Sequence, residues 1–381
     1  MYQRLQKLAG RGKESCFLWG ARQTGKSTLL KSLFPSSPYY DLLLSDEFER
    51  FNRHPKIFRE ELLADPTVKK FPIIVDEVQK VPILLDEIQW LIVNHGLQFI
   101  LCGSSARKLK RGHGNLLGGR AIRYELFPLV YQEIPNFNLL HALNFGFLPR
   151  HYRQANPSRL IKSYVGDYLK EEIAAEALTR NIPAFGRFLE ASAFSNGEIV
   201  NYHNIASECG VSAPTVKEYF QILEDTLIGR FVPSFQKRPK RRVILAPKFY
   251  FFDVGLANCL LKRGKIVDRS ETFGKAFEHF ISQEIFAYRH YSGKDYAISY
   301  WRTASQLEVD FILGDHELAI EVKGTHETQH SHLKGLRAFQ EEYKVKRSIV
   351  VSLDPKIRKT NGIWIYPWKD FLEELWSGKL I

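Results

Sequence analysis

Short apolar runs separated by charged or turn-forming segments extend along the chain, a pattern typical of a protein that contains both strands and helices. Residues 15–19, 71–75 and 97–102 are nearly continuous apolar runs, as expected for strands buried on both faces of a parallel sheet. After the first run, Leu29, Leu30 and Leu33 recur with helical spacing. The amino-terminal third is therefore predicted to be a parallel sheet flanked by helices.

A second pattern, in residues 307–324, predicts two strands around a turn. Residues 314–317 have turn chemistry, so Leu313 should pair with Leu318 and Asp310 should lie opposite Glu321. Two opposed carboxylates destabilise a sheet unless a cation lies between them. The alternative is an exposed hairpin whose charges only solvate its outer face.

Helical spacing in residues 201–226 predicts a helix, a tight turn and a second helix. Gly210 would make the turn, Ser212 would cap the second helix, and the apolar stripe of that helix would be buried. Its exposed face would carry Thr215, Lys217 and Gln221, which are candidates for contacts with nucleic-acid bases. The alternative is a helix pair used only for packing.

A basic segment follows this helix pair. From Arg230 to Tyr250 the chain has seven Lys or Arg residues and no acid. Two strands around this segment would form a wing, the arm that a winged helix lays on the phosphate backbone. The candidate phosphate contacts are Lys237, Arg238, Lys240, Arg241 and Arg242.

Overall charge agrees with a polyanionic partner. The 381 residues contain 54 Lys and Arg against 42 Asp and Glu, a net charge of +12, which favours nucleic acid, DNA before RNA. No run is long and apolar enough for a membrane span, so no membrane contact is expected. The four cysteines lack metal or disulfide spacing, which predicts a reducing, cytoplasmic location.

The strand predicted at residues 15–19 leads into G-x-x-x-x-G-K-S, the P-loop pattern, which indicates ATP and Mg²⁺ as ligands. Backbone N–H groups of such a loop wrap the phosphates, Lys26 would reach the β- and γ-phosphates, and the Ser27 hydroxyl would ligate the metal. The predicted nucleotide-binding residues are Gly20, Ala21, Arg22, Gln23, Thr24, Gly25, Lys26, Ser27, Thr28 and Ser104.

Acidic and small polar residues follow the next two predicted strands. Asp76 would hold Mg²⁺ and Glu77 would act as general base towards the attacking water. Ser104 or Ser105 would sense the γ-phosphate, although either serine could instead cap a helix. Arg120 and Arg123 are candidate arginine fingers across a subunit interface, which would make the protein a homo-oligomer.

The opposed carboxylates of the predicted hairpin have a chemical interpretation. Asp310 and Glu321 would hold Mg²⁺, and Lys323 would add a positive charge near a phosphodiester. This arrangement resembles the core motif of the PD-(D/E)XK nuclease superfamily. That superfamily often places a further acid on a preceding helix, which the resemblance assigns to Glu278, with Glu284 as the alternative.

Landmarks from end to end resemble one family, the prokaryotic AAA-like ATPases related to STAND-type signal-transducing ATPases. The matching stretches are GARQTGKS, IIVDEVQK, LCGSSARKL, LLGGRAIRYELFPL, SYVGDYLKEEI, NIPAFGRFLE, KFYFFDVGLAN and EVDFIL with IEVK. The resemblance implies a carboxyl-terminal domain long filed as of unknown function, and it implies no settled substrate.

Together these patterns predict an α/β protein of three modules. They are a P-loop ATPase domain (1–139), a helical and winged helix-turn-helix region (140–262) and a restriction-endonuclease-like α/β domain (263–381). The expected function is ATP binding and hydrolysis with DNA binding and Mg²⁺-dependent DNA cleavage, in defence or repair. The alternative is a nucleotide-switched DNA- or protein-binding regulator whose nuclease-like domain is inactive.

Overall fold

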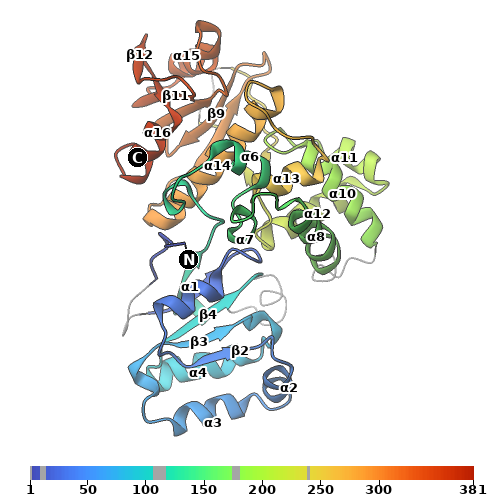
Figure 1. Ribbon diagram of the computed structural model, residues 1–381, viewed down its shortest axis with the longest axis vertical. Coiled ribbons are helices and arrows are strands. Elements are labelled where there is room, and N and C mark those ends of the chain that lie inside the picture. The colour runs from blue at the N-terminus through green and yellow to red at the C-terminus, as the bar shows by residue number, and fades with distance from the viewer. Residues whose placement is uncertain (1, 9–13, 106–116, 174–180, 238–240) are drawn as a thin grey trace. The chain divides into compact units, whose positions relative to one another are not determined.

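The computed structural model describes residues 2–8, 14–105, 117–173, 181–237 and 241–381 (Figure 1). The chain divides into two compact units. Unit 1 comprises Met1–Leu129 with Asp225–Ile228, and unit 2 comprises Val130–Glu224 with Gly229–Ile381. Within the described ranges, no helix is both long and apolar enough to cross a membrane.

Unit 1 is built on a parallel sheet with the strand order β2-β3-β4-β1-β5. Its strands are β1 (Ser15–Trp19), β2 (Tyr39–Asp41), β3 (Ile73–Asp76), β4 (Phe99–Gly103) and β5 (Ala121–Glu125). Its helices are α1 (Lys26–Leu33), α2 (Ser45–Arg53), α3 (Lys56–Ala64), α4 (Leu84–His95) and the short η1 (Val68–Lys70), η2 (Val78–Lys80) and η3 (Leu117–Gly119).

Alternate residues of these strands bury both faces of the sheet, as the continuous apolar runs predict. Phe17, Val75 and Phe99 belong to one core cluster, in which Phe51 of α2 and Phe58 of α3 also pack. The rings of Phe51 and Phe58 meet edge to face, with centroids 5.4 Å apart. The predicted parallel sheet flanked by helices is thereby confirmed, with helices on both sides of it (Figure 1).

Unit 2 contains a helical part and a mixed sheet. Its helices are η4 (Tyr131–Glu133), α6 (Leu139–Phe145), α7 (Pro149–Tyr152), α8 (Ser158–Ser163), η5 (Tyr164–Ile173), α10 (Ile182–Phe194), α11 (Tyr202–Cys209), α12 (Ala213–Asp225), α13 (Val254–Leu260), α14 (Glu271–Ser292), η6 (His330–Leu333), α15 (Lys334–Glu342) and α16 (Trp368–Trp376). Its strands are β6 (Gly229–Val232), β7 (Lys248–Phe251), β8 (Ile298–Arg302), β9 (Glu308–Leu313), β10 (Leu318–Val322), β11 (Arg347–Ser352), β12 (Arg358–Thr360) and β13 (Ile363–Pro367).

The six-stranded sheet has the order β12-β13-β11-β10-β9-β8. Strands β9 and β10 form the predicted hairpin, and Leu313 pairs with Leu318 as the sequence predicts. Ile312 then pairs with Ala319 and Phe311 with Ile320, so the predicted register is confirmed. This register leads towards Asp310 and Glu321 as the next opposed positions.

The predicted helix pair is present as α11 and α12. Gly210 ends α11 in the left-handed conformation (φ 66°), which glycine adopts without a Cβ penalty. Ser212 Oγ accepts a hydrogen bond from the Thr215 backbone N–H at 3.3 Å, so the predicted cap is formed. Phe220 of α12 packs edge to face on Phe249 of β7, with ring centroids 4.8 Å apart.

Residues 233–247, which we call the arm, connect β6 to β7. The two strands pair antiparallel, as the sequence predicts, yet both described ends of the arm lie along the edge strand β8. The Phe235 N–H donates to the Tyr300 carbonyl oxygen at 2.7 Å, and the Ile244 N–H donates to the Arg302 carbonyl oxygen at 2.9 Å. The sequence could not show this attachment, because it depends on a strand more than 50 residues away.

The close packing of α15 on β9 can be tested at Gly335. A Cβ added at this buried glycine would lie 1.7 Å from the Glu308 carbonyl oxygen, so helix and strand would have to separate. Gly335→Ala should therefore lower the free energy of unfolding by about 1–3 kcal/mol or more. Urea denaturation would measure this change.

Gly274 on α14 is a matched control for that prediction. A Cβ there would meet no atom within 4 Å, so Gly274→Ala should stabilise the helix by about 0.5–1 kcal/mol. Equal unfolding midpoints for the two variants would contradict the packing described.

Candidate functional site

The loop between β1 and α1 lies at the carboxyl ends of parallel strands, where α/β sheets bind ligands. It contains the predicted residues Gly20, Ala21, Arg22, Gln23, Thr24 and Gly25, followed by Lys26, Ser27 and Thr28 at the start of α1. A Cβ at Gly20 would lie 2.6 Å from the Leu126 carbonyl oxygen, so only glycine fits there. Lys26 donates to the carbonyl oxygens of Gly20 at 2.7 Å and Ala21 at 3.1 Å.

The structure brings the two predicted metal ligands of unit 1 together. Ser27 Oγ donates to Asp76 Oδ2 at 2.6 Å, and the Tyr39 hydroxyl donates to the same oxygen. Burial opposes ionisation of Asp76, but hydrogen bonds from Ser27, Tyr39 and Cys102, together with the Lys26 charge, outweigh it and lower the pKa of the carboxyl. Oxygen donors of this kind suit Mg²⁺ beside a nucleotide phosphate.

Gln79 links the predicted base to the predicted sensor. Its side-chain amide donates to Glu77 Oε2 and, at 3.2 Å, to Ser104 Oγ. Gly103 lies beside it, and a Cβ there would be 2.3 Å from Gln79 Oε1. The sequence analysis did not single out Gln79, although this polar residue lies only two positions after Glu77 in the sequence.

The other expectations for unit 1 have mixed outcomes. Ser105 is buried, and the segment after it lies outside the described residues, so its alternative role as a helix cap stays a prediction. Arg120 and Arg123 are exposed, and their proposed role across a subunit interface also stays a prediction. Arg4, which the sequence did not single out, donates to the Thr24 carbonyl oxygen at 2.6 Å and so supports the loop.

In unit 2 the predicted carboxylates gather around β9, β10 and α14. Asp310 is 4% exposed and Glu321 is 6% exposed. Asp310 Oδ2 accepts a hydrogen bond from the Val322 backbone N–H at 2.8 Å, which ties the two strands together at this point. Lys323 Nζ lies 2.5 Å from Glu321 Oε1.

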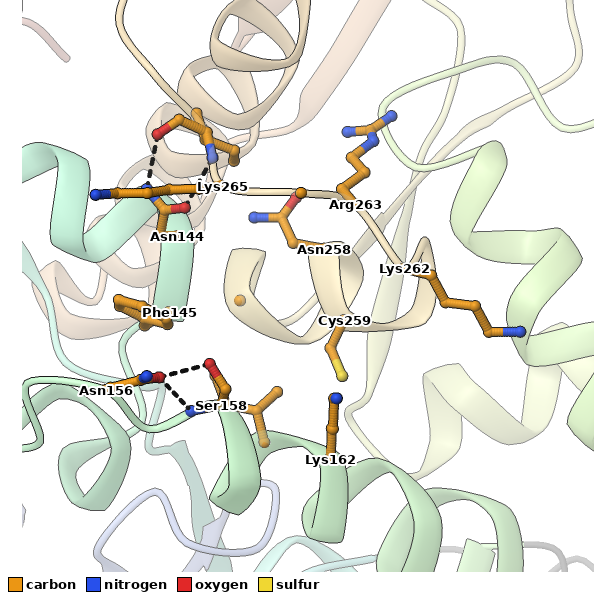
Figure 2. Close-up of a pocket in the computed structure, with 14 residues that line it drawn as sticks. Asn144, Phe145, Asn156, Ser158, Lys162, Asn258, Cys259, Lys262, Arg263 and Lys265 are labelled. Carbon is orange, nitrogen blue, oxygen red and sulfur yellow. Dashed lines mark hydrogen bonds between the residues drawn. The ribbon is translucent and has the colours of Figure 1, made fainter.

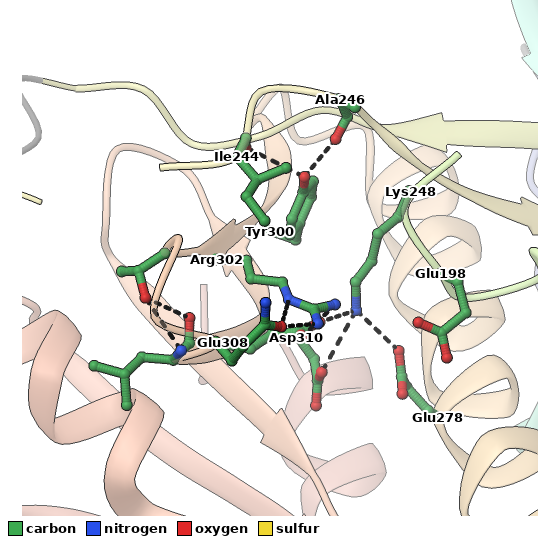
Figure 3. A network of polar contacts seen from close by, with 12 residues as sticks. Glu198, Ile244, Ala246, Lys248, Glu278, Tyr300, Arg302, Glu308 and Asp310 are labelled. Carbon is green, nitrogen blue, oxygen red and sulfur yellow. Dashed lines mark hydrogen bonds and ion pairs between the residues drawn. The ribbon is translucent and has the colours of Figure 1, made fainter. Parts of the chain in front are cut away.

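The cluster also contains Lys248 and Glu308, which sequence reasoning missed (Figure 3). Lys248 Nζ lies 2.5 Å from Glu308 Oε1, 3.5 Å from Glu278 Oε1 and 3.7 Å from Asp310 Oδ1. Glu308 lies two residues before Asp310 on β9, so strand alternation could have found it. No local signal distinguished Lys248 from the other basic residues near the arm.

Burial and mutual repulsion perturb the ionisation of this cluster. Burial raises the pKa of Glu278 to about 7, against the attraction of Lys248. Burial, with the Asp310 charge, raises the pKa of Glu321 to about 8, and Lys323 opposes this rise. Burial alone would lower the pKa of Lys248, but Tyr250, Glu278 and neighbouring acids raise it well above the usual value.

The fit of these residues to a divalent cation is partial. Asp310 and Glu321 offer hard oxygen donors, and Glu321 Oε2 is buried with no hydrogen-bond partner among the described residues. Glu278 and Glu308 contact Lys248 instead. Among the described residues, no group of three or more His, Cys, Asp or Glu side chains has the arrangement of a metal site.

Glu278 and Glu284 were the alternatives for the acid on the helix, and the structure separates them. Glu278 Oε1 accepts a hydrogen bond from Tyr250 at 2.5 Å within the cluster. Glu284 accepts from the Tyr131 backbone N–H at 2.7 Å and from Trp376 Nε1 at 2.7 Å. Glu284 therefore has a structural role away from the cluster.

The candidate nucleic-acid contacts fall into two groups. On α12, Lys217 and Gln221 are exposed, as the sequence predicts, whereas Thr215 is half-buried. In the arm, Lys237 pairs with Asp315, and Arg241 pairs with Glu341 and Glu342 at 2.5 and 2.7 Å. Arg242 is exposed, while Arg238 and Lys240 lie outside the described residues.

A pocket of about 430 Å³ in unit 2 was not predicted (Figure 2). Lys162, Lys262, Arg263 and Lys265 line it, and no acid is among the lining residues of the described chain. Lys262 pairs with Glu190 at 3.0 Å, and Figure 2 shows Lys262 and Arg263 pointing away from Lys162. Because these cations do not converge, the pocket is not arranged around a single anion.

Three family models match the chain. Residues 12–135 match a model described as an AAA domain. Residues 136–266 match a domain of unknown function (DUF8612), and residues 273–371 match another domain of unknown function (DUF4143). With the loop geometry, the first match supports an AAA-type P-loop ATPase domain that binds and hydrolyses ATP.

Among solved structures, the chain is similar to a Signal Transduction ATPase with Numerous Domains (STAND) protein that has a tetratricopeptide repeat sensor, from Pyrococcus horikoshii. The sequence identity is 12% and the TM-score is 0.21. The match covers 76% of this chain and 48% of that chain, so this chain spans about half the length of that protein. A search of curated proteins gives no match.

The P-loop geometry generates a first functional prediction. The Lys26 ammonium donates hydrogen bonds to two loop carbonyl oxygens, and its predicted role is to reach the phosphates of bound ATP. Lys26→Ala should therefore reduce the ATP hydrolysis rate at least about 100-fold, the effect of losing one preorganised charge-stabilising group. Phosphate release from purified protein would measure it.

Lys69 provides a matched control. It is an exposed lysine on η1, before the amino end of β3 and hence at the opposite edge of the sheet. Lys69→Ala should hydrolyse ATP at the wild-type rate. Undiminished hydrolysis by Lys26→Ala would refute the P-loop assignment.

Proposed function

We propose that the protein is an ATPase that binds DNA and cleaves it by Mg²⁺-dependent phosphodiester hydrolysis. The observation that carries the nuclease part is the pair of buried carboxylates, Asp310 and Glu321, with Lys323 beside them. Burial of several charges on two interior strands of a sheet is unfavourable for folding alone and is characteristic of functional sites.

In this proposal Asp310 and Glu321 would hold Mg²⁺, with Glu321 Oε2 free to accept it. When bound, the metal would lower the pKa of a water molecule and polarise the phosphodiester. Lys323 would place a positive charge beside the developing negative charge on phosphate. Glu278, which accepts a hydrogen bond from Tyr250, would hold the Lys248 ammonium in position.

One observation favours the alternative, a nucleotide-switched regulator whose nuclease-like domain is inactive. Lys248 Nζ already lies within 3.7 Å of carboxylate oxygens of Glu278, Glu308 and Asp310, so an internal ammonium offsets part of the charge of the cluster without a metal. Incubation of the purified protein with plasmid, duplex and single-stranded oligonucleotides and RNA, with and without Mg²⁺ and ATP, separates the two. If the protein cleaves none of these nucleic acids, the result would support the regulator.

A carboxylate prediction follows from the nuclease proposal. Asp310→Asn and Glu321→Gln keep the side-chain shape but remove a charged oxygen donor. Each should reduce Mg²⁺-dependent cleavage at least about 100-fold, because the metal loses a ligand. ATP hydrolysis should change less than about twofold, since the P-loop belongs to the other compact unit.

Asp295 gives the control for this pair. Its side chain is 97% exposed, so Asp295→Asn removes a carboxylate of unit 2 that does not belong to the cluster. This variant should cleave like the wild type. Full cleavage by Asp310→Asn would disprove the assigned metal site.

The arm generates a separate prediction about DNA binding. Lys237 and Arg241 are held by acids of unit 2, so the proposed phosphate contacts are Arg238, Lys240 and Arg242. Each phosphate contact adds about 0.9 to the slope of log affinity against log salt. Neutralising these three should flatten the slope by roughly two to three units, measured by fluorescence anisotropy.

The comparison variant neutralises Lys237 and Arg241. Because these two residues form ion pairs within the protein, the salt slope should change by less than about one unit. Thr215→Ala and Gln221→Ala should instead alter the preference between sequences, since base contacts carry sequence information. An unaltered slope after neutralising Arg238, Lys240 and Arg242 would place the DNA elsewhere.

A further inference from the structure

Lys248 occupies an unusual position for a lysine, because its side chain is only 2% exposed and carboxylates lie on several sides of it. It opens β7, a strand of the small sheet with β6, whereas the carboxylates come from α14 and β9. Figure 3 shows its ammonium directed between Glu278, Glu308 and Asp310.

The surroundings hold this ammonium from further directions. The Tyr300 ring centroid is 5.6 Å from Lys248 Nζ, within the range of a cation–π contact. The Tyr250 hydroxyl donates to Glu278 Oε1 at 2.5 Å and so fixes one of the carboxylates that Lys248 contacts. Arg302 lies on the outer side of Glu308, with Nη1 3.2 Å from Oε2.

Such a shell of oxygens is also what a hard divalent cation requires. Asp310 belongs to both arrangements: Lys248 contacts its Oδ1, and the proposed metal site uses the same carboxylate with Glu321. Two cations that share one carboxylate in a buried cluster repel each other strongly, because little water screens them. Lys248 and a divalent cation at Asp310 should therefore oppose each other.

We propose that Lys248 is a tethered cation that competes with the divalent metal for the carboxylate cluster, so that metal loading requires the ammonium to withdraw. This inference rests on the proposed metal site at Asp310 and Glu321. It assigns Lys248 a regulatory role, because the chain itself supplies the competing charge and the metal affinity depends on where β7 holds it.

The test measures metal binding directly, with Mn²⁺ as the probe and without nucleotide. Free Mn²⁺ is followed by electron paramagnetic resonance on the full chain. Lys248→Met keeps an unbranched apolar side chain but removes the charge, so it should bind Mn²⁺ at least about tenfold more tightly than the wild type. Lys248→Arg keeps the charge and should bind as weakly as the wild type.

Two controls locate and qualify the effect. Lys275→Met removes an exposed lysine of α14 that pairs with Glu198 at 3.4 Å, and it should leave Mn²⁺ affinity unchanged. Combining Lys248→Met with Asp310→Asn should abolish the gain, because the gained site needs the Asp310 carboxylate. If Lys275→Met tightened binding equally, the gain would be a general charge effect and the proposal would fail.

Thermal unfolding covers the case in which Lys248→Met folds poorly. Without metal, its carboxylates repel one another and Tm should fall, whereas saturating Mn²⁺ should raise its Tm more than that of the wild type. A fall in Tm that Mn²⁺ does not reverse would mean a purely structural lysine and would overturn the proposal.

The remaining outcomes separate this inference from the proposed function. Wild-type binding with no gain in Lys248→Met would overturn the competition while leaving the metal site in place. Absence of Mn²⁺ binding in both proteins would remove the metal site itself, and with it both the nuclease proposal and this inference.

Discussion

Repulsion between carboxylates is the constraint that organises the carboxyl-terminal sheet and the elements around it. Glu278, Glu308, Asp310 and Glu321 converge from α14, β9 and β10, and a fold can keep them together only if cations lie between them or some of the carboxyl groups are protonated. Lys323, directly after the end of β10, supplies one such cation, and Lys248 of β7 supplies a second one. Ion pairs of Lys248 thereby link the start of β7, directly after the arm, to α14 and β9.

In the P-loop of unit 1, charged side chains are also paired with groups of the chain itself. There Lys26 is held by the carbonyl oxygens of Gly20 and Ala21, and Asp76 by hydroxyl donors. Lys26 and Asp76 are both paired within the chain, because a buried unpaired charge is costly. Nucleotide binding at the P-loop would therefore be an exchange of partners.

Local patterns were sufficient for much of the fold. The P-loop, the acids at the carboxyl end of β3, the register set by Leu313 and Leu318, and the turn at Gly210 all follow from short-range periodicity and turn chemistry. Long-range partners were not accessible in this way. Lys248 and the ion pairs of Arg241 with Glu341 and Glu342 depend on contacts across about 30 to 100 residues, which no window of sequence contains.

The charge cluster of unit 2 is difficult to explain by stability alone. Replacing a buried ion network with well-packed apolar residues is often neutral or stabilising by about 1–4 kcal/mol, so a fold that needed only a core would not require it. The Lys248 side chain, only 2% exposed, also loses the hydration that the ammonium of a surface lysine keeps. The network also places in the interior an oxygen of Glu321 for which the described residues provide no hydrogen-bond partner, which agrees with the cation site proposed here.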